Sequence, residues 1–267
     1  MSDGGNRAAC QICEGTPKSA AGSAAFVVCL RFFAYMEVGV IEKKEACELL
    51  LFNRNYLYQL LYKAFGREPD RAFLDLLTAE HTGESFALLG GEVPESVPAY
   101  LARLRMEAQA PDYIQQLRDE YTRLFVGPLE MEAPPWESVY LGEEGMLFQE
   151  STLNVRECYR RFGLLPEEYP RVADDSLALE LGFMAELARR SVDAFEANDT
   201  DTLELTLRGA RDFLTEHLLL WVPKLLERLN KTEGRFYPRL AHILDSFLKI
   251  DLETVNDLLS EGVHAHD

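Results

Sequence analysis

The 267-residue sequence lacks the short motifs that mark most nucleotide-binding and hydrolytic enzymes. It has no G-x-x-x-x-G-K-[ST] phosphate loop, no G-x-G-x-x-G fingerprint, no H-E-x-x-H zinc motif and no G-x-S-x-G nucleophile turn. Only five histidines are present, two of them in the terminal stretch HAHD, so few general bases are available. We therefore expect no catalytic residues, no metal site and no bound cofactor.

Positive charge is scarce in this chain. There are 27 Lys and Arg residues against 45 Asp and Glu residues, which gives a formal net charge of −18. Proteins that bind nucleic acids need clustered Lys and Arg side chains against the phosphates, so we expect no nucleic-acid partner. A strong negative field raises the rate of encounter with a basic partner, although it also simply keeps a protein soluble.

Long apolar runs are missing as well. The most apolar stretch, residues 24–41, is interrupted by Arg31 and Glu37, and a membrane span needs ~20 apolar residues. It is a poor signal peptide too, because Arg31 breaks its apolar centre and no small-residue cleavage site follows. We expect a cytoplasmic protein without stable membrane insertion. Residues 1–40, which begin rich in Ala, Ser and Gly, are interpreted as a poorly ordered N-terminal extension, with Met36 as a second candidate for the start. Residues 41–267 are interpreted as one all-helical domain.

The cysteines are too few and too widely spaced for a disulfide framework. Their number, five, is odd, which favours free thiols in a reducing compartment. Cys10 and Cys13 form a C-x-x-C pair, but no second pair follows at zinc-site spacing, so a metal or redox site there is disfavoured.

Helical periodicity is what the sequence has in abundance after residue 45. Apolar residues in the C-terminal half repeat at spacings of 3 and 4, which is typical of buried helix faces in a bundle. One such stripe is Leu177, Leu181, Met184 and Ala188, and a second is Leu203, Leu207, Ala210, Leu214, His217 and Trp221. Strand signals are weak and limited to SVYL and MLF around residues 138–148. We predict an all-α fold, a helical bundle of about ten helices with a Pro-rich loop between the two halves.

Several residues predict where helices begin and end. Gly66 and Gly163 are expected to stop helices, and Asp112 and Ser151 are expected to cap helix starts. Pro223 is expected to kink or end the helix that contains it.

The first unusual constellation is the stretch YTRLFVGPLEMEAPPWESVY, residues 121–140. Three residues share a helix face before the break at Gly127: Tyr121, Leu124 and Phe125. Two prolines, Pro134 and Pro135, should hold the next segment extended, so that side chains alternate along it. The side chains on one side are those of Trp136, Ser138 and Tyr140. Aromatic residues on extended backbone are typical of a peptide-binding platform. Alternatively, the aromatic side chains only fill the core beneath the loop.

The second constellation is ADDSLALELGFM, residues 173–184. Asp174 and Asp175 stand where a helix begins, and Glu180 follows in its first turns. They predict either an acidic rim on an apolar groove or ordinary capping and favourable interaction with the helix dipole.

The three stretches YTRLFVGP…APPWESVY, ADDSLALELGFM and FLTEHLLLWVPKL resemble, in that order, the TorD/DmsD family of redox-enzyme maturation chaperones. The resemblance covers residues 44–250. It implies an all-helical cytoplasmic chaperone of anaerobic respiration rather than an enzyme. Such a chaperone binds the twin-arginine signal peptide of a molybdopterin-containing oxidoreductase and assists cofactor insertion and assembly before export. The implied partners are the catalytic subunit and its signal peptide, with the chaperone itself a monomer or homodimer.

The same resemblance implies a set of peptide-binding residues, carried over position by position. They are Tyr121, Leu124, Phe125, Trp136, Ser138, Tyr140, Asp175, Ser176, Glu180, Met184, His217 and Trp221. The sequence departs from the family's Pro-x-Asp-His run, because Ala173 replaces the proline and Ser176 the histidine. Any role of that histidine is therefore not carried over.

Two other classes of protein remain open at this stage. One is a small hydrolase or nucleotide-processing enzyme that uses Asp175 and Glu180. The other is a helical scaffold for subunit assembly that never contacts a signal sequence.

Overall fold

A computed structural model of the chain describes residues 43–89, 96–127, 130–142, 150–165 and 173–262. Within these ranges the protein is helical, which confirms the prediction of an all-α bundle of about ten helices. The proposed extension (residues 1–40), the C-x-x-C pair, MLF and the HAHD stretch lie outside the described residues. None of the described helices has both the length and the apolar character to cross a membrane.

The helices before the Pro-rich segment are α2 (Lys43–Gly66), α3 (Arg71–Leu77), α4 (Glu80–Leu89), α5 (Val97–Glu107) and α6 (Tyr113–Tyr121). Helix α6 continues into a π-helical turn, η1 (Thr122–Val126), and the short α7 (Glu137–Leu141) follows the segment. The second half contains α8 (Glu150–Arg161), α9 (Leu177–Glu196), α10 (Thr200–Phe213), η3 (Leu214–Leu218), α11 (Leu219–Leu229), α12 (Phe236–Asp257) and η4 (Leu258–Gly262).

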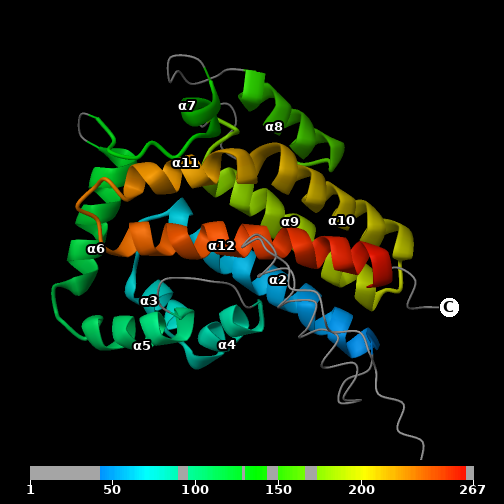
Figure 1. Ribbon diagram of the computed structural model, residues 1–267, viewed down its shortest axis with the longest axis horizontal. Coiled ribbons are helices and arrows are strands. Elements are labelled where there is room, and N and C mark those ends of the chain that lie inside the picture. The colour runs from blue at the N-terminus through cyan, green and yellow to red at the C-terminus, as the bar shows by residue number, and fades with distance from the viewer. Residues whose placement is uncertain (1–42, 90–95, 128–129, 143–149, 166–172, 263–267) are drawn as a thin grey trace, which may run out of the picture.

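Helix α9 lies at the centre of the bundle (Figure 1). It packs against α2 on one side and α10 on the other, while α11 packs along α12. Helices α3, α4 and α5 lie together at one side of the bundle, and α7 and α8 lie at the opposite side.

The two predicted apolar stripes form much of the core. All four residues of the α9 stripe are fully buried, and none of the six residues of the second stripe is more than 4% exposed. Burial of these side chains is the main favourable term for folding, and it explains why the stripes predicted the helices well.

Of the five predicted helix boundaries, the two glycine stops are confirmed, the two caps are corrected, and Pro223 lies inside its helix. Helix α2 ends at Gly66, and Gly163 has φ +67° after α8. Ser151 does not cap α8, because that helix already includes Glu150. Asp112 occupies the first position before α6, but its side chain accepts from Gln116 Nε2 instead of a backbone N–H. Pro223 does not end its helix, since α11 continues to Leu229.

A buried ion pair joins α2 to α12. Arg54 donates from Nε and Nη2 to the two carboxylate oxygens of Asp251, at 2.5 and 3.1 Å. Tyr58 Oη also donates to Asp251 Oδ2, at 2.6 Å, and all three residues are fully buried. Burial lowers the pKa of Arg54, but the carboxylate of Asp251 outweighs this effect, so the pKa is raised and the guanidinium stays charged.

The first turn of α12 is capped by a side chain from another helix. Glu120, near the end of α6, accepts hydrogen bonds from the backbone N–H groups of Arg235, Phe236 and Tyr237. Helix starts leave such N–H groups without partners, and a carboxylate there is further favoured by the helix dipole.

Candidate functional site

The Pro-rich segment is fixed to the start of α9 by backbone hydrogen bonds. Leu177 N donates to Pro135 O at 2.9 Å, and Glu137 N donates to Asp175 O at 3.0 Å. Between them, Trp136 and Ser176 form an isolated antiparallel bridge. These contacts join residues about forty positions apart in the chain, so the loop's position is set by α9 and not by its own prolines.

The expected extended run through residues 136–140 is wrong. After Trp136 the chain turns into α7, because Glu137–Leu141 is helical. Ser138 is fully buried, while Trp136 and Tyr140 are half-buried. The ring of Tyr140 stacks on Trp221 of α11, with 5.6 Å between centroids and 25° between planes. Tyr140 therefore has a packing role, and both aromatic side chains of the loop keep part of their surface exposed.

The two aspartates before α9 neither cap that helix nor form an exposed acidic rim. Both are fully buried. Asp175 Oδ2 accepts from Ser138 N at 2.8 Å, and Asp174 Oδ2 accepts from Arg156 Nε and Nη2 at 2.8 and 2.6 Å. The capping group is instead Ser176, whose hydroxyl accepts from Leu179 N at 3.3 Å. The residue that departs from the family's histidine thus caps α9.

A buried polar cluster lies beneath α7. Trp221 Nε1 donates to Glu180 Oε2 at 2.9 Å, and His217 Nδ1 lies 3.0 Å from Glu137 Oε2. On the other side of the imidazole, Nε2 lies 3.7 Å from Cys158 Sγ. Glu137, Glu180, His217 and Trp221 are all buried. Neither Asp175 nor Glu180 is open to solvent, which removes the basis for an enzyme built on them.

Burial and neighbouring charges decide the ionisation of this cluster. Burial raises the pKa of Glu180, and the carboxylates of Glu137 and Asp175 raise it further against the opposing bond from Trp221, which favours the neutral form of Glu180. Burial lowers the pKa of His217, but its contacts with Cys158 and Glu137 outweigh this and raise the pKa to about 9. His217 is therefore a cation at neutral pH.

Glu137 and Cys158 were not among the predicted site residues. Glu137 falls at the first position of a five-residue helix, where no periodicity reveals a buried face. Cys158 is half-buried in α8, and its only signal is its spatial neighbour 59 residues later in the chain. Neither residue could be identified as a site residue from the sequence, because each becomes one only through its contact with His217 of η3.

The charge on His217 predicts a pH dependence of stability. Its pKa is raised from 6.5 to about 9 on folding, so its stabilising contribution is complete below pH 6.5 and is lost as the pH rises to 9. We expect the free energy of unfolding to fall by at most about 3 kcal/mol over this range. Urea titrations at several pH values should show the decline, and His217→Gln should flatten it. An equal decline in that variant would contradict the assignment.

The remaining predicted residues belong to the surrounding core. Tyr121 and Phe125 pack edge to face, and both rings contact Tyr237 of α12. Leu124 is fully buried, and its carbonyl accepts from Ala133 N at 2.9 Å, which links η1 to the Pro-rich segment. Met184 is fully buried in the centre of α9.

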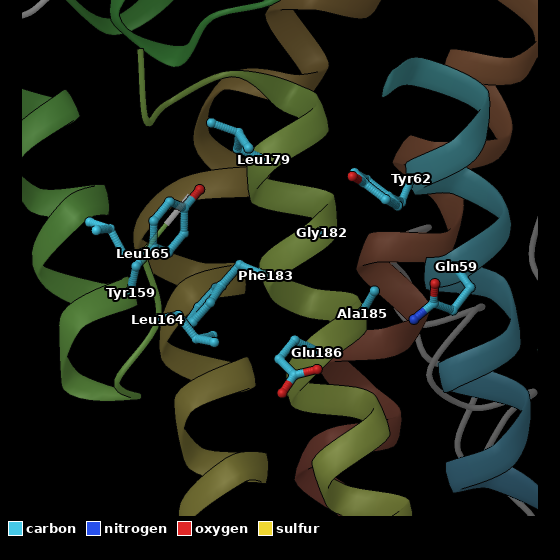
Figure 2. Close-up of a pocket in the computed structure, with 10 residues that line it drawn as sticks. All are labelled: Gln59, Tyr62, Tyr159, Leu164, Leu165, Leu179, Gly182, Phe183, Ala185 and Glu186. Atoms are coloured by element: carbon cyan, nitrogen blue, oxygen red, sulfur yellow. The ribbon is translucent and has the colours of Figure 1, made fainter. Parts of the chain in front are cut away.

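An apolar pocket opens on the outer face of α9, between α8 and α2 (Figure 2). Its volume is about 270 Å³, and it is lined by Gln59, Tyr62, Tyr159, Leu164, Leu165, Leu179, Gly182, Phe183, Ala185 and Glu186. A Cβ atom at Gly182 would lie 3.3 Å from the ring of Tyr62, so the missing side chain keeps the pocket open. Hydrogen bonds from Arg189 and Arg190 lower the pKa of Glu186 to about 2. The Glu186 carboxylate that lines the pocket is therefore ionised and paired with these two arginines.

The described part of the chain contains no group of three or more His, Cys, Asp or Glu residues that could hold a metal ion.

Comparison with known proteins places the chain among proteins named as chaperones. It is 27% identical over 213 residues to the chaperone protein TorD of Shewanella oneidensis, covering 79% of this chain and 94% of that protein. It is 29% identical over 194 residues to TorD of Vibrio cholerae, covering 72% and 81%. It is also 31% identical over 128 residues to a protein named as the Tat proofreading chaperone DmsD of Haemophilus influenzae, covering 48% and 56%.

The helical bundle and these relatives define a redox-enzyme maturation chaperone, not an enzyme. Residues 91–227 match the family described as nitrate reductase delta subunit. With that match over half of its length, the chain belongs to this family of TorD- and DmsD-like chaperones, which confirms the resemblance found in the sequence.

Proposed function

We propose that this protein is a cytoplasmic chaperone for a molybdopterin-containing oxidoreductase, and that it binds the twin-arginine signal peptide of that enzyme. By holding the signal peptide, it gives time for cofactor insertion and assembly before export. Family membership and the name of the DmsD relative, a Tat proofreading chaperone, support this proposal.

The apolar pocket on α9 is the observation that carries the peptide-binding part of the proposal. A signal peptide has an apolar stretch after its arginines, and such side chains bind best in a concave apolar surface. Leu179, Gly182 and Phe183, which line the pocket, all come from the ADDSLALELGFM stretch. Tyr62 forms the opposite wall and is 40% exposed, so it is available for contact.

The Pro-rich segment extends the same surface toward the start of α9. Trp136 pairs with Ser176, which precedes Leu179 of the pocket by one helical turn. We assign direct peptide contact to Trp136 and Tyr140, two of the three half-buried members of the predicted set. The third, Tyr121, packs its ring against Phe125 and Tyr237 instead. The buried members act as support for Trp136 and Tyr140, because contact with Asp175, His217 or Trp221 would require the loop to open.

The arginines of the peptide are attracted by the overall charge of the protein, not by Asp175. A net charge of −18 produces a negative field over the surface, which raises the association rate with a cationic peptide. This contribution is screened by salt, so we expect binding to weaken as ionic strength rises, and a peptide with the arginines replaced by glutamines to bind more slowly.

The pocket can be tested with two variants of matched chemistry on one helix. Tyr62 and Phe52 both lie on α2 and are 40% and 41% exposed, but only Tyr62 lines the pocket. In anisotropy titrations with a fluorescent twin-arginine signal peptide, Tyr62→Ala should raise Kd about tenfold or more, the usual effect of removing an aromatic anchor. Phe52→Ala should leave Kd within about twofold of wild type.

Trp136→Ala provides a second measurement on the same surface, with a loss of similar size expected. Equal effects of the Tyr62 and Phe52 variants, or no effect of either, would contradict binding in the pocket. Binding of the oxidoreductase without its signal peptide, at the same affinity as with it, would instead indicate a helical assembly scaffold.

A further inference from the structure

Three side chains from three separate elements form a line of contacts beside the Pro-rich segment. Cys158 of α8 lies 3.7 Å from His217 Nε2 on η3, and His217 Nδ1 lies 3.0 Å from Glu137 Oε2 at the start of α7. His217 and Glu137 are 4% and 2% exposed, whereas Cys158 is half-buried. A thiol, an imidazole and a carboxylate are thus joined in sequence, and Cys158 is the most exposed residue of the three.

This arrangement is the one that activates a nucleophile. The base must be within reach of the nucleophile, and a third group must orient the base. Glu137 accepts from Nδ1, so Nε2 faces the sulfur of Cys158, and an imidazolium at this position stabilises a thiolate. We propose that Cys158 is a reactive thiol, activated by the neighbouring imidazole of His217, which Glu137 orients, and that small hydroperoxides oxidise it to a sulfenic acid.

The groups around His217 favour its charged form. Glu137 faces it from α7 and Cys158 from α8, while the ring of Phe213 of α10 lies tilted against the imidazole, with 4.7 Å between ring centroids. Asp175, just before α9, and Glu180 of α9 belong to the same cluster, and the raised pKa of Glu180 favours its neutral form. The raised pKa of His217, about 9, agrees with a stable imidazolium over the physiological range.

The oxidation balances with hydrogen peroxide as the only added reactant. The Cys158 thiolate sulfur attacks one peroxide oxygen, an S–O bond forms, and the O–O bond breaks. The sulfur is oxidised by two electrons, and the peroxide is reduced to water when the leaving hydroxide takes the proton of His217 Nε2. The sulfenic hydroxyl then lies beside the neutral imidazole, and a thiol can later reduce it.

The accessibility of Cys158 selects a small oxidant. Cys158 is half-buried and packs against the hydrophobic core, so reaction with a molecule of the size of hydrogen peroxide is favoured over reaction with a bulky substrate. The second cysteine in the described residues, Cys47, is 1% exposed in a separate apolar cluster with Leu51 and Phe195. It therefore serves as an internal reference for a buried thiol.

Thiol reactivity measured on the full-length protein tests the proposal. Alkylation of Cys158 by iodoacetamide, followed by mass spectrometry between pH 5 and 9, should be faster in wild type than in the variants, with the largest difference at pH 6. In His217→Gln the rate should climb with pH like that of an ordinary thiol of pKa about 8.5, and at pH 6 it should be lower by about tenfold or more. Glu137→Gln, which keeps the shape of the side chain, should lower the pH 6 rate less.

Peroxide provides the second measurement. Hydrogen peroxide with dimedone should label Cys158 in wild type, label it far less in His217→Gln, and leave Cys47 unmodified. If His217→Gln does not fold, the comparison of wild type with Glu137→Gln decides. A wild-type alkylation rate at pH 6 that is no higher than that of the variants, or dimedone labelling that is equal in wild type and variant, would overturn the proposal. Because thiol reactivity needs no peptide, this result is independent of the proposed chaperone function.

Discussion

Replacement of Asp251 by alanine is expected to destabilise the protein by about 3–5 kcal/mol, because it leaves the Arg54 guanidinium buried without a counter-charge. The pair is fully buried between α2 and α12, and Tyr58 also loses its acceptor. Urea denaturation followed by circular dichroism should show the loss as a lower midpoint at an unchanged slope.

Asp245 on the same helix is the matched control. It pairs with Lys249, whose side chain is 59% exposed, so Asp245→Ala should cost about 1 kcal/mol or less. A second comparison separates charge from packing. The double variant Arg54→Met with Asp251→Leu removes both charges and should recover most of the stability that Asp251→Ala loses. If the double variant is as unstable as Asp251→Ala, packing and not the unpaired charge is responsible.

Trp221→Ala is expected to lower the free energy of unfolding by about 3–5 kcal/mol, the scale for truncating a buried tryptophan. Trp221 is fully buried, stacks on Tyr140 and donates to Glu180. Its loss leaves a cavity and a buried carboxyl without its donor. It also removes the support of Tyr140, so peptide affinity should fall together with stability.

Leu220 is the control for this variant, because it is the preceding residue of the same helix and is 50% exposed. Leu220→Ala should change stability by about 0.5 kcal/mol or less. Trp221→Phe keeps a six-membered apolar ring but removes the donor to Glu180 and part of the indole volume, so it should cost about 1–3 kcal/mol. A Trp221→Ala protein as stable as Leu220→Ala would contradict the packing described for α11.

The helices and their buried faces could be predicted from sequence because they depend on local spacing. The stripe from Leu203 to Trp221 keeps spacings of 3 and 4, and all of its residues are buried, even through the π-helical turn η3. The three quoted stretches identified the family for a similar reason, since each is a contiguous pattern that can be read along the chain.

The chemistry of the site could not be predicted in the same way. Asp and Glu side chains usually lie at the protein surface, and one prediction for Asp175 was therefore an exposed position on the rim of a groove. In the structure the backbone of Ser138, 37 residues earlier, provides the hydrogen bond that allows Asp175 to be buried. Likewise His217 meets Glu137 across 80 residues. Such contacts form only when α7 docks on α9 and η3. No local sequence pattern predicts that docking.

The cap of α12 by Glu120 has a consequence for the order of folding. The carboxylate and the three N–H groups that it satisfies are 115–117 residues apart, so neither helix completes this contact alone. Starting a helix is the unfavourable step in its formation, and here that step is assisted by a residue made much earlier in synthesis. The first turn of α12 should therefore become protected from hydrogen exchange only when α6 has docked.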